Sequence, residues 1–255
     1  MVSRLAVVTG AGGGIGSACA RALAPTHDLV LCIDRNQDSA AETARHIGVA
    51  GGRAQALTAD ATAADFGPSV ATAARDCGLV TTVVHALAHE EHTPADDLSL
   101  DSLLTSLQVG PVSAFSLFRS IAVGGGLAPE AAFTAIGSLH EKYPFRNCLG
   151  YNAAHGALGQ VVRTLAHEWS DRRVRVNAVV PGWIATPGEL LLYGEEHLSR
   201  VAQQLPFRRM GSVEQVAAAV AFLSSAAADY ISGSFLTVDG ALSVSLAQLP
   251  GEEEK

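Results

Sequence analysis

The chain of 255 residues is poor in the residue types that stabilise small secreted domains. It has four cysteines and only 5% aromatic residues, and no two cysteines have the Cys-x-x-Cys spacing. Secreted domains held by disulfides are far richer in cysteine, and metal-binding thiols are usually paired at short spacing. We therefore predict that Cys19, Cys32, Cys77 and Cys148 are buried reduced thiols.

The chain also lacks long apolar runs and basic clusters. No apolar stretch reaches the roughly 18 residues that suggest a membrane span. Lysine and arginine number 17 against 25 aspartate and glutamate, a net charge of −8, which disfavours binding to nucleic acid. Residues 1–5, Met-Val-Ser-Arg-Leu, do not have the pattern of a secretory signal. We expect a cytoplasmic protein that binds neither membranes nor nucleic acid.

Short β-branched apolar runs alternate with Ala-rich segments of helical character along the chain. Strands are predicted at 5–9, 28–34, 53–60, 80–86, 132–138, 173–180 and 234–238. Helices are predicted at 15–24, 39–47, 64–76, 98–122, 150–169 and 213–225. Strands that are continuously apolar are covered on both faces, which is typical of parallel sheets. The order predicts a single domain over residues 1–255 with an α/β fold, a doubly wound parallel sheet of Rossmann type with helices on both faces.

A glycine-rich loop, Thr9-Gly10-Ala11-Gly12-Gly13-Gly14-Ile15-Gly16, joins the first predicted strand to the first helix. Glycines allow a tight turn there and let backbone N–H groups approach a pyrophosphate, which the helix N-terminus stabilises. Such a loop alone is a weak signal, but its position between a strand and a helix strengthens it. We predict that a dinucleotide binds at Gly10, Gly13, Gly14, Ile15 and Gly16.

An acid stands at the end of the next predicted strand. Asp34 lies eighteen residues beyond Gly16, where a carboxylate can accept both ribose hydroxyls of an adenosine and repel a 2′-phosphate. This favours NAD over NADP as the cofactor. Arg35 follows directly and could pair with a 2′-phosphate, so NADP remains the less favoured cofactor. Asp34 could also be a simple turn residue before Asn36.

Two polar residues stand thirteen positions apart near the middle of the chain. Ser138 closes a predicted strand, and Tyr151 lies at the start of the following helix. With the glycine-rich loop, Asp34, the Asp60-Ala61 pair and the segment Pro181-Gly182-Trp183-Ile184-Ala185-Thr186, they resemble the short-chain dehydrogenase/reductase family over essentially the whole chain. The resemblance implies an oxidoreductase in which Ser138 orients the substrate oxygen and Tyr151 transfers a proton. It also implies further cofactor contacts, from Asp60, Ala61, Ala86, Tyr151, His155, Ile184 and Thr186.

The same resemblance implies a substrate lid and a subunit interface. The lid is expected near residues 183–210, and the subunit contacts in residues 213–245, within a homotetramer or, as the next choice, a homodimer. Apolar residues after the Pro-Gly turn, such as Trp183 and Tyr193, suggest either a partly hydrophobic substrate or ordinary helix packing.

Three polar features of the family pattern are altered in this chain. Four residues after the tyrosine, where the family has lysine, stands His155. The position of the family's relay asparagine is Leu107, and its Asn-Asn-Ala-Gly motif is replaced by His85-Ala86-Leu87-Ala88. Residues four apart on a helix share a face, so we expect Tyr151 and His155 to be in contact. A histidine is mostly neutral at pH 7 and lowers the pKa of a nearby phenol less than a lysine does.

Histidines and acids cluster on the loop that should border the nicotinamide. They are His85, His89 and His92 with Glu90 and Glu91 between them, and His140 follows Ser138 closely. Imidazoles and carboxylates can bind metals, but their spacing matches no zinc pattern, and we predict no metal site. These side chains either line a polar substrate pocket or are solvated.

The sequence therefore predicts an NAD(H)-dependent oxidoreductase that interconverts a carbonyl and a secondary alcohol, with Ser138, Tyr151 and His155 as catalytic residues. A neutral His155 makes the tyrosinate harder to form, which favours ketone reduction over alcohol oxidation. Two alternatives stay open. One is a relative that keeps the cofactor but performs elimination, isomerisation or aldol-type chemistry, and the other is a non-catalytic NAD-binding homologue.

Overall fold

Seven parallel strands form one sheet in the computed structural model, which describes residues 4–246. Their order in the sheet is β3-β2-β1-β4-β5-β6-β9, and neighbouring strands pair in parallel throughout. This confirms the doubly wound parallel sheet predicted from the sequence. The strands are β1 Arg4–Thr9, β2 Leu29–Asp34, β3 Ala54–Thr58, β4 Leu79–His85, β5 Leu127–Ile136, β6 Arg175–Pro181 and β9 Phe235–Val238.

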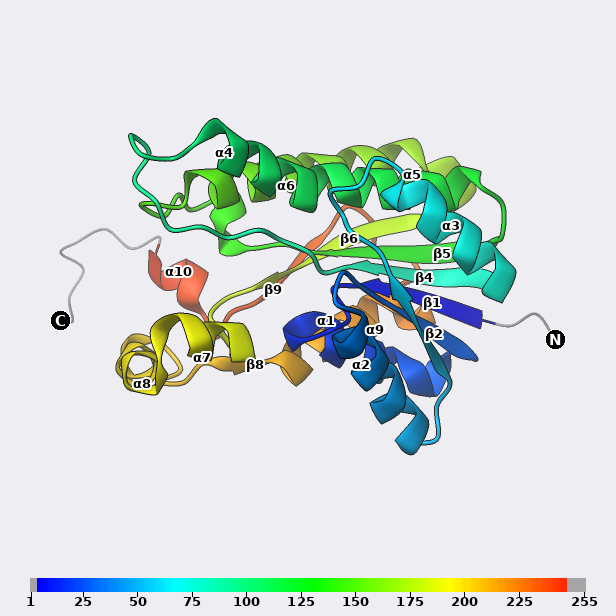
Figure 1. Cartoon of the computed structure of the whole chain (residues 1–255), viewed down its shortest axis with the longest axis horizontal. Coiled ribbons are helices and arrows are strands. Elements are labelled where there is room, and N and C mark those ends of the chain that lie inside the picture. Colours follow the sequence, from blue (N-terminus) through cyan, green and yellow to red (C-terminus); the bar gives the residue numbers. More distant parts are fainter. Residues whose placement is uncertain (1–3, 247–255) are drawn as a thin grey trace.

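Helices cover both faces of the sheet (Figure 1). One layer contains α1 Gly14–Leu23, α2 Gln37–Val49 and α9 Val213–Ser224. The other contains α3 Phe66–Cys77, α4 Leu100–Leu107, α5 Ser113–Val123 and α6 Leu149–Glu168. Three further helices, α7 Pro187–Tyr193, α8 Glu195–Gln204 and α10 Leu242–Leu246, lie together at one end of the molecule. The short strands β7 Ile184–Ala185 and β8 Gly211–Ser212 pair beside them.

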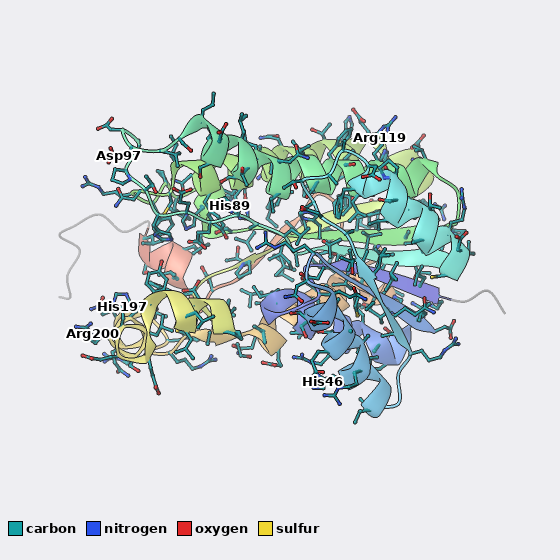
Figure 2. All side chains as sticks on the ribbon, in the orientation of Figure 1. His46, His89, Asp97, Arg119, His197 and Arg200 are labelled. Atoms are coloured by element: carbon teal, nitrogen blue, oxygen red, sulfur yellow. The ribbon has the colours of Figure 1, made fainter. Side chains whose placement is uncertain are left out.

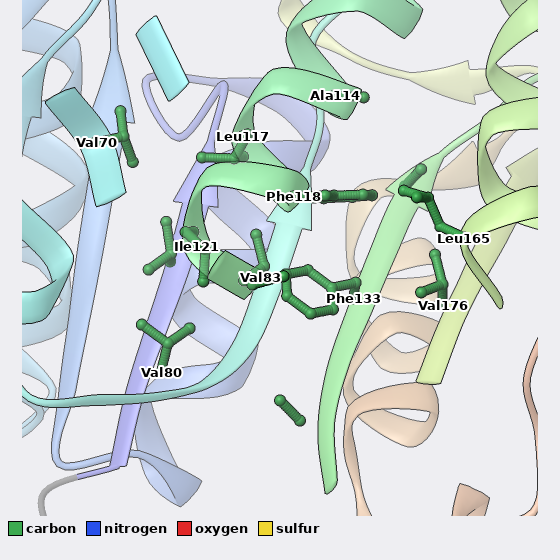
Figure 3. Close-up of a cluster of buried hydrophobic side chains, with 14 of the residues drawn as sticks. Val70, Val80, Val83, Ala114, Leu117, Phe118, Ile121, Phe133, Leu165 and Val176 are labelled. Atoms are coloured by element: carbon green, nitrogen blue, oxygen red, sulfur yellow. The ribbon is translucent and has the colours of Figure 1, made fainter. Parts of the chain in front are cut away.

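The core explains why the strands are apolar at successive positions. Along β1, Leu5 and Val7 belong to the cluster under α3, α5 and α6, whereas Ala6 and Val8 belong to the cluster under α1 and α9. Successive side chains of a strand point to opposite faces, so a sheet covered on both sides buries all of them. Figure 3 shows the first cluster, in which Phe118 of α5 packs against Phe133 of β5 with ring centroids 5.1 Å apart. Burying one such phenylalanine stabilises the fold by about 1.5–3 kcal/mol.

Two predicted elements differ from the structure. The single helix predicted at 98–122 is two helices, α4 and α5, joined by a wide turn of π-helical type at Gln108–Val112. Pro111 lies in that turn, where a residue without a backbone N–H fits the broken hydrogen-bond pattern. The strand predicted at 132–138 ends at Ile136, so Ser138 does not close a strand. It instead caps a short 3₁₀ turn at Leu139–Glu141.

The cysteines form no disulfide within residues 4–246. Cys19, Cys32 and Cys148 are buried, but Cys77 at the end of α3 is half-buried, so the prediction of four buried thiols is wrong for this residue. Burial raises the pKa of Cys19 and of Cys32 to about 12, which keeps both thiols protonated. Within residues 4–246 no helix combines the length and the apolar character needed to cross a bilayer.

Candidate active site

The candidate site lies at the carboxyl ends of the parallel strands, where the sheet order reverses between β1 and β4. At such a point the connections leave toward opposite faces of the sheet, and the loops on either side leave a crevice. The glycine-rich loop follows β1, and the loop that contains Glu90 and His92 follows β4. Figure 2 shows His89 on this second loop, in the same half of the view as His197 of α8.

The glycine-rich loop is shaped by close backbone contacts. Gly10 has φ +68°, and a Cβ added there would lie 2.2 Å from the carbonyl oxygen of Ala86. A Cβ at Gly16 would lie 2.1 Å from the carbonyl oxygen of Gly10. Both contacts are far below the van der Waals distance, so only glycine fits at either position. The loop is thereby held against the end of β4.

The other end of this loop is open. Gly13 is the N-cap residue of α1, and no side chain caps the helix. A Cβ at Gly13 would meet nothing within 4 Å, so the start of the helix is open at this residue. An uncapped helix N-terminus beside an open glycine binds anions through its N–H groups and dipole. Gly14, Ile15 and Thr186 lie at the same place, since Thr186 Cγ2 is 3.7 Å from the position of a Cβ on Gly14. The residues fit a dinucleotide pyrophosphate.

The acidic residues predicted to bind the adenosine lie at the ends of β2 and β3. The Asp34 carboxylate accepts hydrogen bonds from the backbone N–H groups of Gly12, at 2.9 Å, and Asn36, at 3.0 Å. Arg35 beside it is exposed. Asp60 accepts hydrogen bonds from the N–H and hydroxyl of Thr62, which lower the pKa of its carboxyl. Ala61 is buried next to it. Backbone N–H groups therefore fix the orientation of both carboxylates.

Ser138, Tyr151 and His155 come together as the sequence spacing predicts. Tyr151 lies on the first turn of α6, and its ring centroid is 4.3 Å from that of His155 one turn later. The Ser138 hydroxyl lies near enough to the Tyr151 phenol to lower its pKa. Ser138 and His155 are both buried, with 9% and 5% of their surface exposed. The predicted contact between Tyr151 and His155 is present.

The electrostatics of this group differ from those of a tyrosine beside a lysine. Burial, and next the negative charge of Glu90, raise the pKa of Tyr151 above its usual value, while the Ser138 hydroxyl opposes this. Burial lowers the pKa of His155 to about 3, so its imidazole is neutral at pH 7. His155 Nδ1 is buried and has no hydrogen-bond partner in the described part of the chain. The phenol is therefore held in its protonated form.

A pocket of about 360 Å³ opens beside Ser138 and Tyr151. The loop after β4 contributes Glu90 and His92, and the segment that follows β6 contributes Trp183, Ile184 and Thr186 together with Glu189 and Tyr193 of α7. His140, Phe145, Arg146 and Cys148 line the side near α6.

Contacts between these segments close one side of the pocket. The Tyr193 hydroxyl lies 3.2 Å from His92 Nε2, which is 2.8 Å from a Glu90 carboxylate oxygen. Trp183 Nε1 donates to Glu189 at 2.9 Å. Burial raises the pKa of the Glu189 carboxyl, and the hydrogen bond from Trp183 lowers it. Burial is the larger effect, so the pKa is raised overall. The expected lid segment therefore contacts the loop after β4 directly.

The predicted histidine cluster separates into distinct environments. His85 is the last residue of β4, fully buried, and its Nε2 lies 2.8 Å from the Ser113 hydroxyl. It neither lines the substrate pocket nor is solvated, so that prediction is wrong for His85. Its position two residues after Val83 gives the reason, because alternate residues of β4 face α5. His92 and His140 do line the pocket. Within residues 4–246 no group of three His, Cys, Asp or Glu side chains could hold a metal ion.

Several pocket residues were not singled out by the sequence patterns. Glu189 and Cys148 show no motif, although Glu189 is the third residue after the helix-capping Thr186 and could have been placed on a helix start. Leu107, at the family's asparagine position, precedes the π-type turn, and the neighbouring Gln108 donates to the carbonyl of Ala61 at 3.4 Å.

Comparison with known proteins gives consistent matches over nearly the whole chain. A sequence family described as Enoyl-(Acyl carrier protein) reductase matches residues 10–243. Galactitol 2-dehydrogenase (L-tagatose-forming) of Cereibacter sphaeroides is 33% identical over 247 residues, which cover 94% of this chain and 94% of that protein. A solved structure from Beutenbergia cavernae with bound NADP at low occupancy has a TM-score of 0.86 and 32% identity, and the match covers 97% of this chain and 98% of that one.

A second solved structure carries both a cofactor and a ligand. A 7α-hydroxysteroid dehydrogenase in complex with NADH and 7-oxo glycochenodeoxycholic acid has a TM-score of 0.86 at 28% identity, and the match covers 93% of each chain. The parallel sheet, the open glycine-rich loop and these matches define an oxidoreductase with a dinucleotide-binding fold. The chain belongs to the short-chain dehydrogenase/reductase family.

Proposed function

We propose that the protein is an NAD(H)-dependent reductase that converts a ketone to a secondary alcohol, and that it performs the reverse oxidation less well. The observation that carries this proposal is that the Tyr151 phenol and the Ser138 hydroxyl line the same pocket. A general acid must hold its proton at the working pH, and an un-ionised phenol meets this requirement. Turnover of NADH with a panel of ketones, followed by absorbance, tests the proposal, and absence of turnover with every ketone contradicts it.

The chain's own residues supply the binding and proton-transfer groups for this reaction. When bound, the nicotinamide supplies the hydride that adds to the carbonyl carbon. Ser138 holds the substrate oxygen, and Tyr151 donates the proton that this oxygen gains as it becomes a hydroxyl. His155, with an unpartnered Nδ1, is suited to hydrogen-bond the ribose next to the nicotinamide. The pyrophosphate would bind at Gly13, Gly14 and the first turn of α1.

Replacing His155 by lysine is expected to improve alcohol oxidation at neutral pH. A positive charge about 5 Å from the phenol, at an effective dielectric of about 20, lowers the pKa of Tyr151 by roughly two units. The oxidation rate at pH 7.5 should therefore rise about tenfold or more, and its pH midpoint should fall. Steady-state oxidation between pH 6 and 10 measures both effects. His155→Gln, which adds no charge, serves as the control, and an unchanged pH profile in His155→Lys contradicts the role of charge at this position.

We propose NAD as the preferred cofactor because of Asp34, whose carboxylate would repel a 2′-phosphate. Asp34→Asn keeps an oxygen that can accept from Gly12 N–H but removes the charge. Its affinity for NAD should fall about 10- to 100-fold, the loss of a charged hydrogen bond, while affinity for NADP should rise. Calorimetry with both dinucleotides measures this. Asp38→Asn, at an exposed position on α2, is the matched control. Equal preference for NADP in the parent protein would contradict the proposal.

We also propose that the chain forms a homo-oligomer, either a tetramer or a dimer. Support comes from exposed apolar side chains on α4 and α5, where Leu100, Leu104 and Phe115 are 67%, 51% and 45% exposed, and from the fully exposed Tyr230 within 213–245. Light scattering should give a mass that is a multiple of 26.3 kDa, and Phe115→Glu should reduce it. A mass of 26.3 kDa for the parent protein would contradict self-association.

A further inference from the structure

His140 is a pocket residue to which the proposed reaction assigns no role. It lies two residues after Ser138, and its backbone N–H donates to the Ser138 hydroxyl oxygen at 3.3 Å. Its ring meets the Tyr151 ring edge-on, with centroids 4.8 Å apart. The imidazole therefore shares one wall of the pocket with the two residues proposed to hold the reacting oxygen.

The tautomer of His140 follows from its partner Asn152. The Asn152 side-chain N–H donates to the carbonyl oxygen of Phe145 at 2.9 Å, which directs the other end of the amide, Oδ1, toward the imidazole. That oxygen lies 2.7 Å from His140 Nδ1 and can only accept. His140 Nδ1 is therefore the protonated nitrogen, and Nε2 carries a lone pair.

The ring is also fixed in orientation. Phe145 stacks on the imidazole of His140, with centroids 4.3 Å apart and planes inclined by 25°. Burial, the largest effect, lowers the pKa of His140, so the neutral form with its Nε2 lone pair predominates at pH 7. No residue between 4 and 246 hydrogen-bonds Nε2. His140 Nε2 is therefore an oriented acceptor without a protein partner among the described residues, in a side chain that lines the pocket. A hydroxyl group of a ligand could donate a hydrogen bond to it.

Other polar groups of the pocket also accept hydrogen bonds. Glu189 has one carboxylate oxygen engaged by Trp183, and Glu90 adds a second carboxylate, whereas Arg146 is an exposed cation at the rim. A pocket with this balance favours ligands that bring hydroxyl groups. Ser138 and Tyr151 hold the reacting oxygen of the substrate, and His140 would hold a second hydroxyl. Because the rings of Tyr151 and His140 are in contact, these two oxygens must lie close together. Oxygens on adjacent carbons are the closest such pair in an alcohol.

We propose that His140 accepts a hydrogen bond from a second substrate hydroxyl on the carbon next to the reacting one, so that the enzyme prefers α-hydroxy ketones and the corresponding vicinal diols. This assignment rests on the proposed function. It makes His140 a specificity-determining residue. The hydride and proton transfers stay the same, and the second hydroxyl is unchanged by the reaction.

Paired ketones that differ only in this hydroxyl test the assignment. Acetoin is compared with 2-butanone, and 2-hydroxycyclohexanone with cyclohexanone, each by kcat/KM with NADH. For each pair, the kcat/KM of the hydroxy ketone is divided by that of the plain ketone. The ratio in the His140→Leu variant, which lacks the imidazole, reflects only the intrinsic difference in reactivity between the two ketones, and the ratio in the parent protein is compared with it. We expect the ratio to fall about 2- to 12-fold in His140→Leu, as the loss of one neutral hydrogen bond predicts.

Two further variants separate specificity from structure. His140→Gln retains an acceptor oxygen near the Nε2 position and should keep part of the ratio, even if His140→Leu is poorly folded. His167→Leu, at an exposed position near the other end of α6, should leave the ratio unchanged. Equal ratios in the parent protein and both His140 variants would overturn the assignment. Turnover of the plain ketones would still support the proposed function in that case. If the parent protein reduces neither hydroxy ketone, the assignment fails, and the wider ketone panel separately decides the proposed function.

Discussion

Replacing Tyr151 by phenylalanine is expected to lower kcat for ketone reduction by about 10²- to 10⁴-fold, the range measured for loss of a general acid. The substitution removes only the phenolic oxygen, so the ring contact with His155 and the packing of α6 should remain. Because Tyr151 is protonated at neutral pH, the lost rate reflects a missing proton donor and not a changed charge. The loss should appear in kcat, with NADH affinity nearly unchanged.

Ser138→Ala is the companion variant for this measurement. It removes the hydroxyl that contacts the phenol but leaves the proton donor, so its kcat should fall less than that of Tyr151→Phe. NADH binding by fluorescence titration should be retained in both variants. A Tyr151→Phe protein that reduces ketones as fast as its parent would show that the proton comes from elsewhere, and the assignment of Tyr151 would be abandoned.

The protein is expected to lose much of its stability between pH 6.5 and pH 5. Burial lowers the pKa of both His85 and His155 to about 3, whereas in the unfolded chain a histidine titrates near 6.5. Below pH 6.5 the unfolded state therefore binds protons that the folded state does not. Below pH 6.5 each of the two histidines therefore lowers the free energy of unfolding by about 1.4 kcal/mol per pH unit. At pH 5 the loss for both together is roughly 4 kcal/mol. Urea unfolding at a series of pH values measures this dependence.

His85→Asn gives a direct control for the acid sensitivity. Asparagine does not titrate, so the slope of unfolding free energy against pH should fall by about half. His167→Asn, at an exposed position, should leave the slope unchanged. A slope below pH 6.5 that is the same in His85→Asn and in the parent protein would show that this histidine does not resist protonation in the fold.

The features predictable from the sequence are those set by local geometry. Tyr151 and His155 are four residues apart on one helix, and helical spacing alone brings their rings together. The sheet also followed from local pattern, because strands such as β1 and β2 are apolar at successive positions, as expected for a sheet covered on both faces. The glycine-rich loop was recognisable because a close backbone approach and a positive φ admit only glycine at Gly10.

The pocket could not be predicted in the same way because distant segments build it. Tyr193 and His92 are 101 residues apart, and no periodicity links α7 to the loop after β4. The tautomer of His140 depends on an amide of Asn152 that is itself oriented by the Phe145 carbonyl. His85 was misplaced for a different reason: its side of β4 could have been obtained by counting two residues from Val83, but its polar character suggested a loop.

The fate of the cofactor hydrogen tests the central claim most directly. Ketones are reduced with NADH deuterated at C4 on the transferred face, and the alcohol is analysed by mass spectrometry. If the protein is an oxidoreductase of the proposed kind, each product molecule carries one deuterium on the carbon that bears the new hydroxyl. An alcohol that contains no deuterium would show that its new hydrogen does not come from the cofactor, and would contradict hydride transfer from the nicotinamide.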